Sequence, residues 1–168
     1  MFIPEGGDKE KLLKSLLEQA LNVEKETIDF KKLRYVMYTR KSTTDETRQE
    51  CSIPDQVADC TQLVNSEGLN LVEIIRESES ARESGIRPKF EQMIVDLKAG
   101  KYDGIIAWHP DRLARNMKDA GTLIDLLDKQ IIKDLRFKTS TFENSPMGKM
   151  LLGISFVLSK QYTDHLSE

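Results

Sequence analysis

The sequence of 168 residues is poor in the groups that most metal sites and many catalytic sites use. It has two cysteines, Cys51 and Cys60, and two histidines, and their spacing matches no CxxC or Cys/His zinc motif. This scarcity predicts a reduced, cytoplasmic protein without a structural metal. No apolar run approaches the roughly 20 residues that a membrane span needs. The amino-terminal residues also lack the basic-then-apolar order of a secretory signal.

An excess of positive charge is missing as well. The chain has 25 Lys and Arg against 28 Asp and Glu, a net charge of −3. Neutralisation of phosphates supplies most non-specific affinity for DNA, so this balance counts against a self-sufficient DNA-binding module. It does not exclude an enzyme that acts on DNA and takes its affinity from another domain. The length and a hydrophobic content of 39% fit one ordinary globular domain.

The apolar periodicity predicts strands that alternate with helices. Strands are predicted at 35–38, 71–75, 104–108 and 135–139. Helices are predicted at 12–21, 52–68, 90–100, 123–127 and 147–162. The Ser- and Glu-rich stretch 77–85 is predicted to be a surface loop. This alternation is typical of an α/β domain with a mostly parallel, twisted sheet of four to five strands in flavodoxin-like layers.

Two polar segments follow strands of this sheet. Arg40 and Ser42 are two residues apart at the end of the first strand, so they are predicted to share a face. Asp111, Arg112 and Arg115 follow the third strand and are predicted to reach the same edge. If this segment is helical, Arg112 and Arg115 share a face. A hydroxyl surrounded by guanidinium groups is suited to attack on a phosphate, because arginine binds phosphate oxygens two at a time.

The usual partners of a serine nucleophile are absent. His109 is the only candidate base, and its place before Pro110 favours a structural role in a loop. The sequence has no GxSxG elbow and no GxxxxGK[ST] loop. The arginines would therefore have to neutralise the charge of the transition state. Two other polar residues could also be candidates for a site. Ser52 is better explained as a helix cap than as a nucleophile, and Gln56 could be only a polar residue of the same helix.

The polar segments resemble a known family. Four motifs occur in order: Tyr38-Thr39-Arg40-Lys41-Ser42, Ser52-Ile53-Pro54-Asp55-Gln56, Ser84-Gly85-Ile86-Arg87-Pro88-Lys89-Phe90 and Asp111-Arg112-Leu113-Ala114-Arg115. Over about residues 33–168 the chain is similar to the catalytic domain of the serine recombinases, which include resolvases, invertases and large serine integrases and transposases.

The resemblance implies a role for each matched residue. Ser42 would attack the scissile DNA phosphodiester and form a 5′-phosphoserine bond. The arginines around the scissile phosphate would be Arg40, Arg87, Arg112 and Arg115. Asp111 would orient an arginine, and Gln56 would support the site. No metal or other cofactor is implied, since the covalent bond stores the energy for religation.

The resemblance also implies an organisation and partners. Residues 1–32 are predicted to be a helical extension, 33–145 the catalytic domain, and 146–168 the start of an oligomerisation helix that continues toward a DNA-binding region. The partners implied are double-stranded DNA and further copies of the chain, first as a dimer and then as a synaptic tetramer. The sequence at 161–168 is most similar to the large-integrase branch.

Two alternatives remain open at this point. The first is a phosphatase or phosphotransferase that uses Ser42 on a small phosphorylated substrate. The second is a non-catalytic, flavodoxin-like interaction domain that acts through the last helix.

Overall fold

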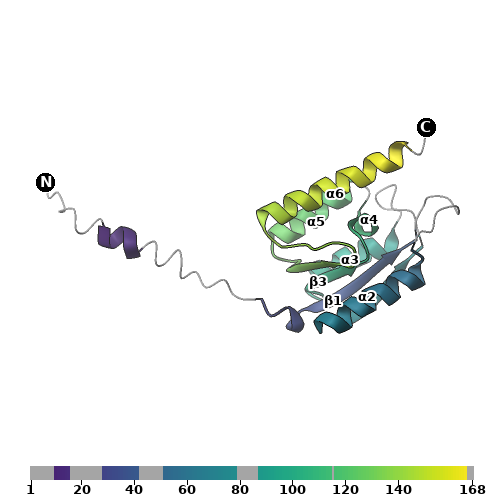
Figure 1. Ribbon diagram of the computed structural model, residues 1–168, viewed down its shortest axis with the longest axis horizontal. Coiled ribbons are helices and arrows are strands. Elements are labelled where there is room, and N and C mark those ends of the chain that lie inside the picture. The colour runs from purple at the N-terminus through teal and green to yellow at the C-terminus, as the bar shows by residue number, and fades with distance from the viewer. Residues whose placement is uncertain (1–9, 16–27, 42–50, 79–86, 115, 166–168) are drawn as a thin grey trace.

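The computed structural model describes residues 10–15, 28–41, 51–78, 87–114 and 116–165 (Figure 1). The strands are β1 (Arg34–Arg40), β2 (Asn70–Glu77), β3 (Gly104–Ala107) and β4 (Asp134–Phe137). The helices are η1 (Phe30–Lys32, a 3-10 turn), α2 (Ile53–Glu67), α3 (Pro88–Lys98), α4 (Pro110–Leu113), α5 (Met117–Asp128) and α6 (Pro146–His165). A short helix also covers residues 10–15.

The four strands form one parallel sheet in the order β2-β1-β3-β4. All residues of β3, and all of β1 except Arg34, are buried. Such continuous burial is expected of parallel strands that are covered on both faces. The predicted α/β class is therefore confirmed, and the carboxyl ends of all four strands lie at one edge.

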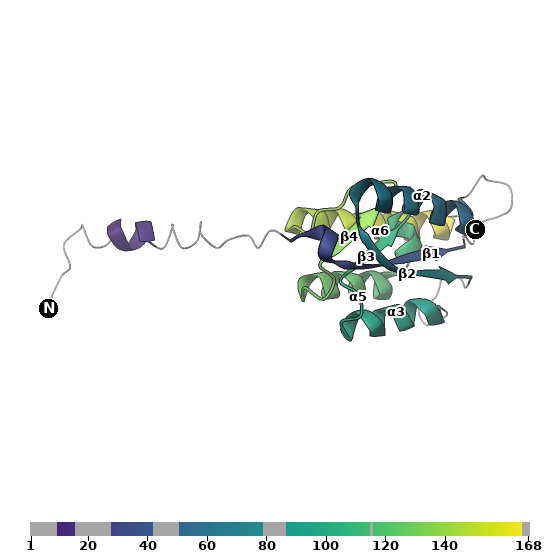
Figure 2. The ribbon, with the colours of Figure 1, turned by 90° about the horizontal axis from the view of Figure 1, so that it is seen from below.

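The helices cover the sheet in two layers (Figure 2). Helix α2 lies on one face, where Cys60 and Val64 pack against Met37 and Ile106 of the central strands. Helices α3 and α5 lie on the other face, and their apolar side chains join Val36 and Tyr38 in the larger core. Helix α6 runs alongside α5 (Figure 1).

The predicted start and end of α2 are confirmed. Ser52 caps the helix, since its Oγ accepts from Asp55 N at 3.3 Å and its own N–H donates to Asp55 Oδ2 at 3.2 Å. Gly68 ends the helix in the left-handed conformation, with φ of 65°. An N-cap of this kind stabilises a helix by about 1 kcal/mol. It also fixes the position of Gln56, which lies in the first turn.

The prediction of a loop from residue 77 is wrong for Glu77 itself. Glu77 is the last residue of β2 and is 1% exposed. Its Oε2 accepts from Lys89 N at 2.9 Å and from Phe90 N at 3.2 Å. These amides belong to the first turn of α3, where no acceptor exists within the helix. The carboxylate is therefore buried because it caps a neighbouring helix; residues 79–86 of the predicted loop lie outside the described part of the chain.

Helix α6 uses only part of its predicted apolar stripe to cover the domain. Leu152 and Phe156 are buried in the larger core. A second row of apolar side chains is between 39% and 60% exposed: Met147, Met150, Leu151, Ile154, Val157 and Leu158. We call this row the α6 stripe. Among the described residues no helix is long and apolar enough to span a membrane.

Candidate active site

Arg40 connects two of the segments that the sequence predicted to meet. Its side chain is fully buried at the end of β1. Nη1 donates to Lys41 O at 2.7 Å, and Nη2 donates to Asp111 O at 3.0 Å. The second bond links the carboxyl end of β1 to α4, which follows β3. The prediction that these segments share one edge of the sheet is confirmed.

Gln56 holds the backbone on both sides of the segment that contains Ser42. Its side chain is fully buried. Oε1 accepts from Arg40 N at 3.3 Å, while Nε2 donates to Arg40 O and to Cys51 O, both at 2.9 Å. Arg40 precedes residues 42–50 and Cys51 follows them. One amide therefore fixes the two ends of this segment relative to α2.

Arg112 is a buried cation with unused donors. Its side chain is 4% exposed, and Nε and Nη1 are buried without a hydrogen-bond acceptor among the described residues. The nearest carboxylate oxygen, Asp111 Oδ1, lies 3.7 Å from Nε, which is too long for a hydrogen bond. Its Cζ lies 5.8 Å from the centre of the Trp108 ring, and Trp108 Nε1 donates to Asp59 Oδ2 at 3.0 Å. A buried, unsatisfied guanidinium of this kind suits an anionic ligand.

Arg87 is also buried, but its donors are used within the protein. Nη2 donates to Asp119 Oδ2 at 2.7 Å, and Nη1 donates to Leu113 O at 2.7 Å and to Tyr38 Oη at 3.3 Å. Its Cζ lies 3.8 Å from the centre of the Phe90 ring. Burial raises the pKa of Tyr38 to about 12, so the phenol stays neutral beside the guanidinium. Arg87 thus joins β1, α3, α4 and α5.

Two predicted site residues, Ser42 and Arg115, lie outside the described part of the chain. Helical spacing does not extend from Arg112 to Arg115, because α4 ends at Leu113 and Ala114 is extended, with φ of −141° and ψ of 140°. The chain leaves the helix here since Asn116 caps the next one, α5, by accepting from Asp119 N. The condition for a shared helical face, one helix that reaches from Arg112 to Arg115, is therefore not met.

The structural role predicted for His109 is confirmed. It is the N-cap of α4, where its Nδ1 accepts from Asp111 N at 3.2 Å. The side chain orients the backbone of Asp111 by this bond. Among the described residues there is no group of three His, Cys, Asp or Glu side chains that could hold a metal ion.

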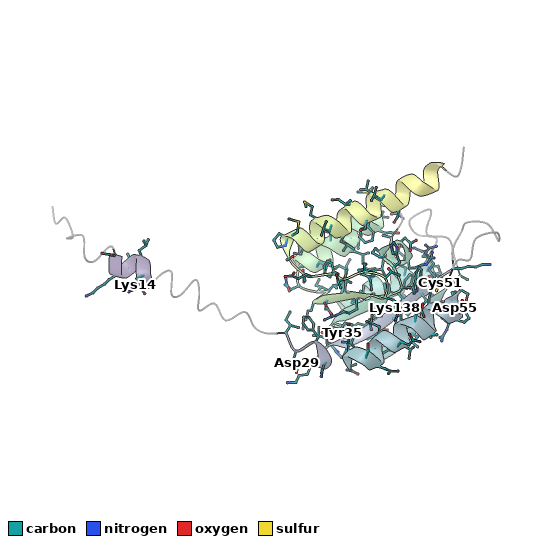
Figure 3. All side chains as sticks on the ribbon, viewed as in Figure 1. Lys14, Asp29, Tyr35, Cys51, Asp55 and Lys138 are labelled. Atoms are coloured by element: carbon teal, nitrogen blue, oxygen red, sulfur yellow. The ribbon has the colours of Figure 1, made fainter. Side chains whose placement is uncertain are left out.

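The residues behind the arginines were not predicted from the sequence. Trp108 follows β3 directly, so the same strand-end argument that identified Asp111 could have found it. Asp59 and Asp119 read as polar positions on amphipathic helices, and their partners are far away in sequence. Figure 3 shows Cys51 and Asp55 at the end of the domain opposite Tyr35, which places the start of α2 beside this site.

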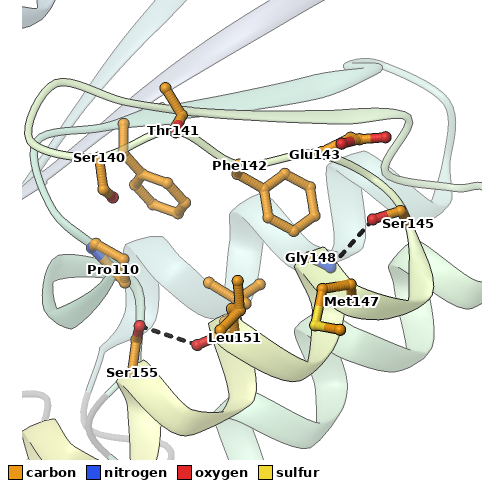
Figure 4. A pocket seen from close by; sticks show the side chains of 12 residues that line it. Pro110, Ser140, Thr141, Phe142, Glu143, Ser145, Met147, Gly148, Leu151 and Ser155 are labelled. Atoms are coloured by element: carbon orange, nitrogen blue, oxygen red, sulfur yellow. Dashed lines mark hydrogen bonds between the residues drawn. The ribbon is translucent and has the colours of Figure 1, made fainter.

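A groove of about 530 Å³ is lined by none of the buried arginines Arg40, Arg87 and Arg112 (Figure 4). It runs between residues 140–145 and the first turns of α6, with Pro110 at its border. The apolar side chains that line it are Phe137, Phe142, Met147, Leu151 and Leu152. Gly148 is required where the two segments touch, because a Cβ atom there would lie 1.8 Å from Glu143 O. Met147 and Leu151 belong to both the groove and the α6 stripe.

Residues 35–168 match the family model described as the resolvase N-terminal domain. The chain belongs to the resolvase family. The match includes the predicted site residues and all of the sheet except Arg34, the first residue of β1. Membership of this family implies DNA binding and oligomeric assembly in general terms. The prediction of a recombinase catalytic domain, made from four short motifs, is confirmed at this level.

Solved structures give the same fold for this resolvase domain. The N-terminal catalytic domain of TP901-1 integrase aligns with a TM-score of 0.57 and 22% identity, covering 80% of this chain and 99% of that chain. A resolvase family site-specific recombinase from Streptococcus pneumoniae aligns with a TM-score of 0.54 and 19% identity, covering 81% and 93%. The C-terminal catalytic domain of ISC1926 TnpA, an IS607-like serine recombinase, aligns with a TM-score of 0.52 and 14% identity, covering 81% of this chain and 100% of that chain. No curated protein matches this sequence.

Proposed function

We propose that this resolvase domain cleaves and rejoins DNA through Ser42. The observation that carries the proposal is Arg112, a buried guanidinium whose Nε and Nη1 have no hydrogen-bond acceptor in the described part of the chain. A phosphodiester oxygen would satisfy these donors and the charge together. Arg40 lies in the same cluster through its bond to Asp111 O.

The proposed reaction exchanges one phosphodiester for another. The Ser42 Oγ–phosphorus bond forms as the bond between phosphorus and the 3′-oxygen breaks, and the serine loses a proton while the 3′-oxygen gains one. The DNA 5′-phosphate is then esterified to Ser42. Attack by the 3′-hydroxyl of a new strand reverses the step and rejoins the DNA. Arg40, Arg112 and Arg115 neutralise the charge on the phosphate, and neither a metal nor another cofactor enters this scheme.

Gln56 and Asp111 have supporting roles in this proposal. Gln56 sets the position of the segment that contains Ser42, through its bonds to Arg40 and Cys51. The Asp111 carboxylate forms a long ion pair with Arg112, at 3.7 Å from Nε, and its proposed role is to orient that guanidinium when the phosphate is bound. Placing the nucleophile and the arginines before DNA arrives lowers the barrier, because orientation alone is worth several kcal/mol, up to about 10.

The proposed macromolecular partners are double-stranded DNA and further copies of the chain. The exposed α6 stripe, together with the groove beside it, supplies an apolar surface of the kind that buries itself against another protein. We assign this surface to assembly into a dimer and then a synaptic tetramer.

Two other sequence-based predictions are kept as part of this proposal. They are a catalytic domain that begins at about residue 33 and a cytoplasmic location of the protein.

The test is capture of the covalent intermediate. The full-length protein is incubated with sheared DNA from the organism that carries the gene, and DNA that remains attached under denaturing conditions is sequenced to identify the site. Ser42→Ala is expected to abolish attachment and leave DNA binding intact. Ser84→Ala, a change in another serine of the four motifs, is expected to leave attachment unchanged. An adduct that survives Ser42→Ala overturns the proposal.

Two further measurements separate the alternatives. A phosphatase that uses Ser42 would release phosphate from a small phosphomonoester without DNA. A non-catalytic interaction domain would lose function when the α6 stripe is replaced and would be indifferent to Ser42→Ala. The family match favours neither alternative.

A further inference from the structure

Asp119 lies behind the arginines, in the first turn of α5. Its side chain is 5% exposed. Oδ2 accepts from Arg87 Nη2 at 2.7 Å and from Asn116 Nδ2 at 2.7 Å, and the backbone N–H of Asp119 donates to Asn116 Oδ1 at 2.8 Å. One carboxylate thus holds both a buried guanidinium and the residue that caps α5.

Arg87 extends this hydrogen-bond network from Asp119 to α4. Its Nη1 donates to the carbonyl oxygen of Leu113, the last residue of α4, at 2.7 Å. The guanidinium is 1% exposed and lies against the Phe90 ring. It cannot turn toward the carboxyl edge of the sheet without breaking two short hydrogen bonds and leaving the Asp119 carboxylate buried with one donor fewer.

These two contacts of Asp119 with described residues therefore fix the chain on both sides of a single short segment. Leu113 is held through Arg87, and Asn116 is held directly. Between them lie only Ala114 and Arg115, and Arg112 immediately precedes Leu113. Ala114 is extended and fully buried, so it does not belong to α4, and we infer its position from the residues held on either side of it.

We propose that Asp119 is a positioning residue for DNA cleavage: through Arg87 and Asn116 it fixes the backbone from Arg112 to Ala114, and with it the Arg112 guanidinium, against the scissile phosphate. The inference rests on the proposed function. It gives Arg87 a role within the protein, in place of the direct phosphate contact that the resemblance implies. Misplacement of reacting groups by about 1 Å can cost about 100-fold in rate, so a buried carboxylate that touches no substrate can control the reaction.

The test compares Asp119→Asn with a matched control in the full-length protein. The probe is a nicked duplex that carries the site identified by covalent capture. Asp119→Asn keeps the size of the side chain but removes the charge that faces two donors. The rate of adduct formation at saturating DNA is expected to fall about 100-fold with unchanged DNA affinity.

Asp134→Asn is the control, because Asp134 is also buried and its Oδ2 accepts from Arg136 Nε at 2.6 Å, at the opposite end of the sheet. It is expected to lower the stability of the fold without changing the rate. Arg87→Gln tests the route: if Asp119 acts through Arg87, adding Asp119→Asn to Arg87→Gln costs little more, because the two effects are not independent.

Four results would overturn the inference. Equal losses of rate in Asp119→Asn and Asp134→Asn would mean that Asp119 only stabilises the fold. A faster rate in Asp119→Asn would mean that Asp119 restrains Arg87 from the DNA. Effects of Asp119→Asn and Arg87→Gln that multiply would mean that the two side chains act separately. An adduct that is lost in Ser42→Ala but unaffected in Asp119→Asn would overturn this inference alone and leave the proposed function standing.

Discussion

The Gln56 side chain makes the tightest connection between the fold and the proposed nucleophile. Gln56→Leu keeps nearly the same volume but removes the hydrogen bonds of the Gln56 side chain to Arg40 N, Arg40 O and Cys51 O, of which the two to Arg40 are buried. We expect a loss of about 2–3 kcal/mol in the free energy of unfolding, measured by urea denaturation, together with slower adduct formation.

Gln62→Leu is the control for Gln56→Leu, since Gln62 is an exposed residue on the same helix. Its stability and rate are expected to stay at the values of the unmodified protein. Normal adduct formation in Gln56→Leu would show that the segment 42–50 is positioned by other contacts.

The difference between what was and was not predictable is sharpest for single residues. Arg40 and Asp111 could be brought together from the sequence, because parallel strands end at a common edge. The role of Glu77 could not be predicted from the sequence. Nothing in a Ser- and Glu-rich stretch shows that one of its carboxylates accepts from the first turn of α3, as Glu77 does from Lys89 N. Arg87 could be named from a motif, but its ion pair with Asp119 depends on the packing of α3 against α5.

Three strands are joined at their amino ends by one carboxylate. Asp103, just before β3, accepts from Arg34 N at 3.0 Å and from Arg34 Nε at 2.8 Å, and it pairs with Lys133 Nζ at 3.4 Å. Arg34 begins β1, and Lys133 directly precedes β4. Since the active-site segments lie at the opposite edge, this contact can be changed to test the fold without touching the site.

The hydrogen bonds from Arg34 lower the pKa of Asp103 to about 2. A carboxyl group with a lowered pKa in the folded state stabilises the fold above the pKa of the unfolded chain, about 4. This contribution is lost as the pH falls from about 4 to about 2. We expect about 1 kcal/mol, reduced from the full linkage value because Arg34 is half-exposed to solvent.

Asp103→Asn is therefore expected to lower the free energy of unfolding at neutral pH and to flatten its dependence on pH between about 4 and 2. Urea denaturation at a series of pH values measures both effects. Asp125→Asn, which removes an exposed pair with Lys129 on α5, serves as the control. An unchanged pH profile in Asp103→Asn would contradict this account of the amino edge.

The elements themselves were predictable where local signals agree. The cap and the terminal glycine of α2 are visible in the sequence, and so is the alternation of strands and helices. The break between α4 and α5 was not, because four residues of helix are too short for periodicity to define, and the break depends on Asn116 capping α5. The apolar stripe of the last helix was predicted as one surface, but only packing shows that Leu152 and Phe156 face inward while their neighbours do not.

At the scale of the whole molecule, the described residues leave one long apolar surface uncovered. The α6 stripe and the groove beside it share Met147 and Leu151. Burial of one such side chain against another copy is worth about 1.5–3 kcal/mol, which corresponds to a change of roughly 10- to 150-fold in a dissociation constant. A single charge in this stripe should therefore weaken assembly without affecting the interior of the domain.

Leu151→Glu and Leu158→Glu change residues that are 55% and 59% exposed, so the domain itself is expected to fold normally by circular dichroism. Sedimentation of the full-length protein should show a shift toward the monomer of at least about tenfold in the dissociation constant. Val95→Glu is the matched control, because Val95 is 57% exposed on α3, away from the stripe. If Leu151→Glu assembles as well as Val95→Glu does, the copies meet through another surface. If both α6 variants dissociate but still form the Ser42 adduct, cleavage does not require this assembly and only strand exchange depends on it.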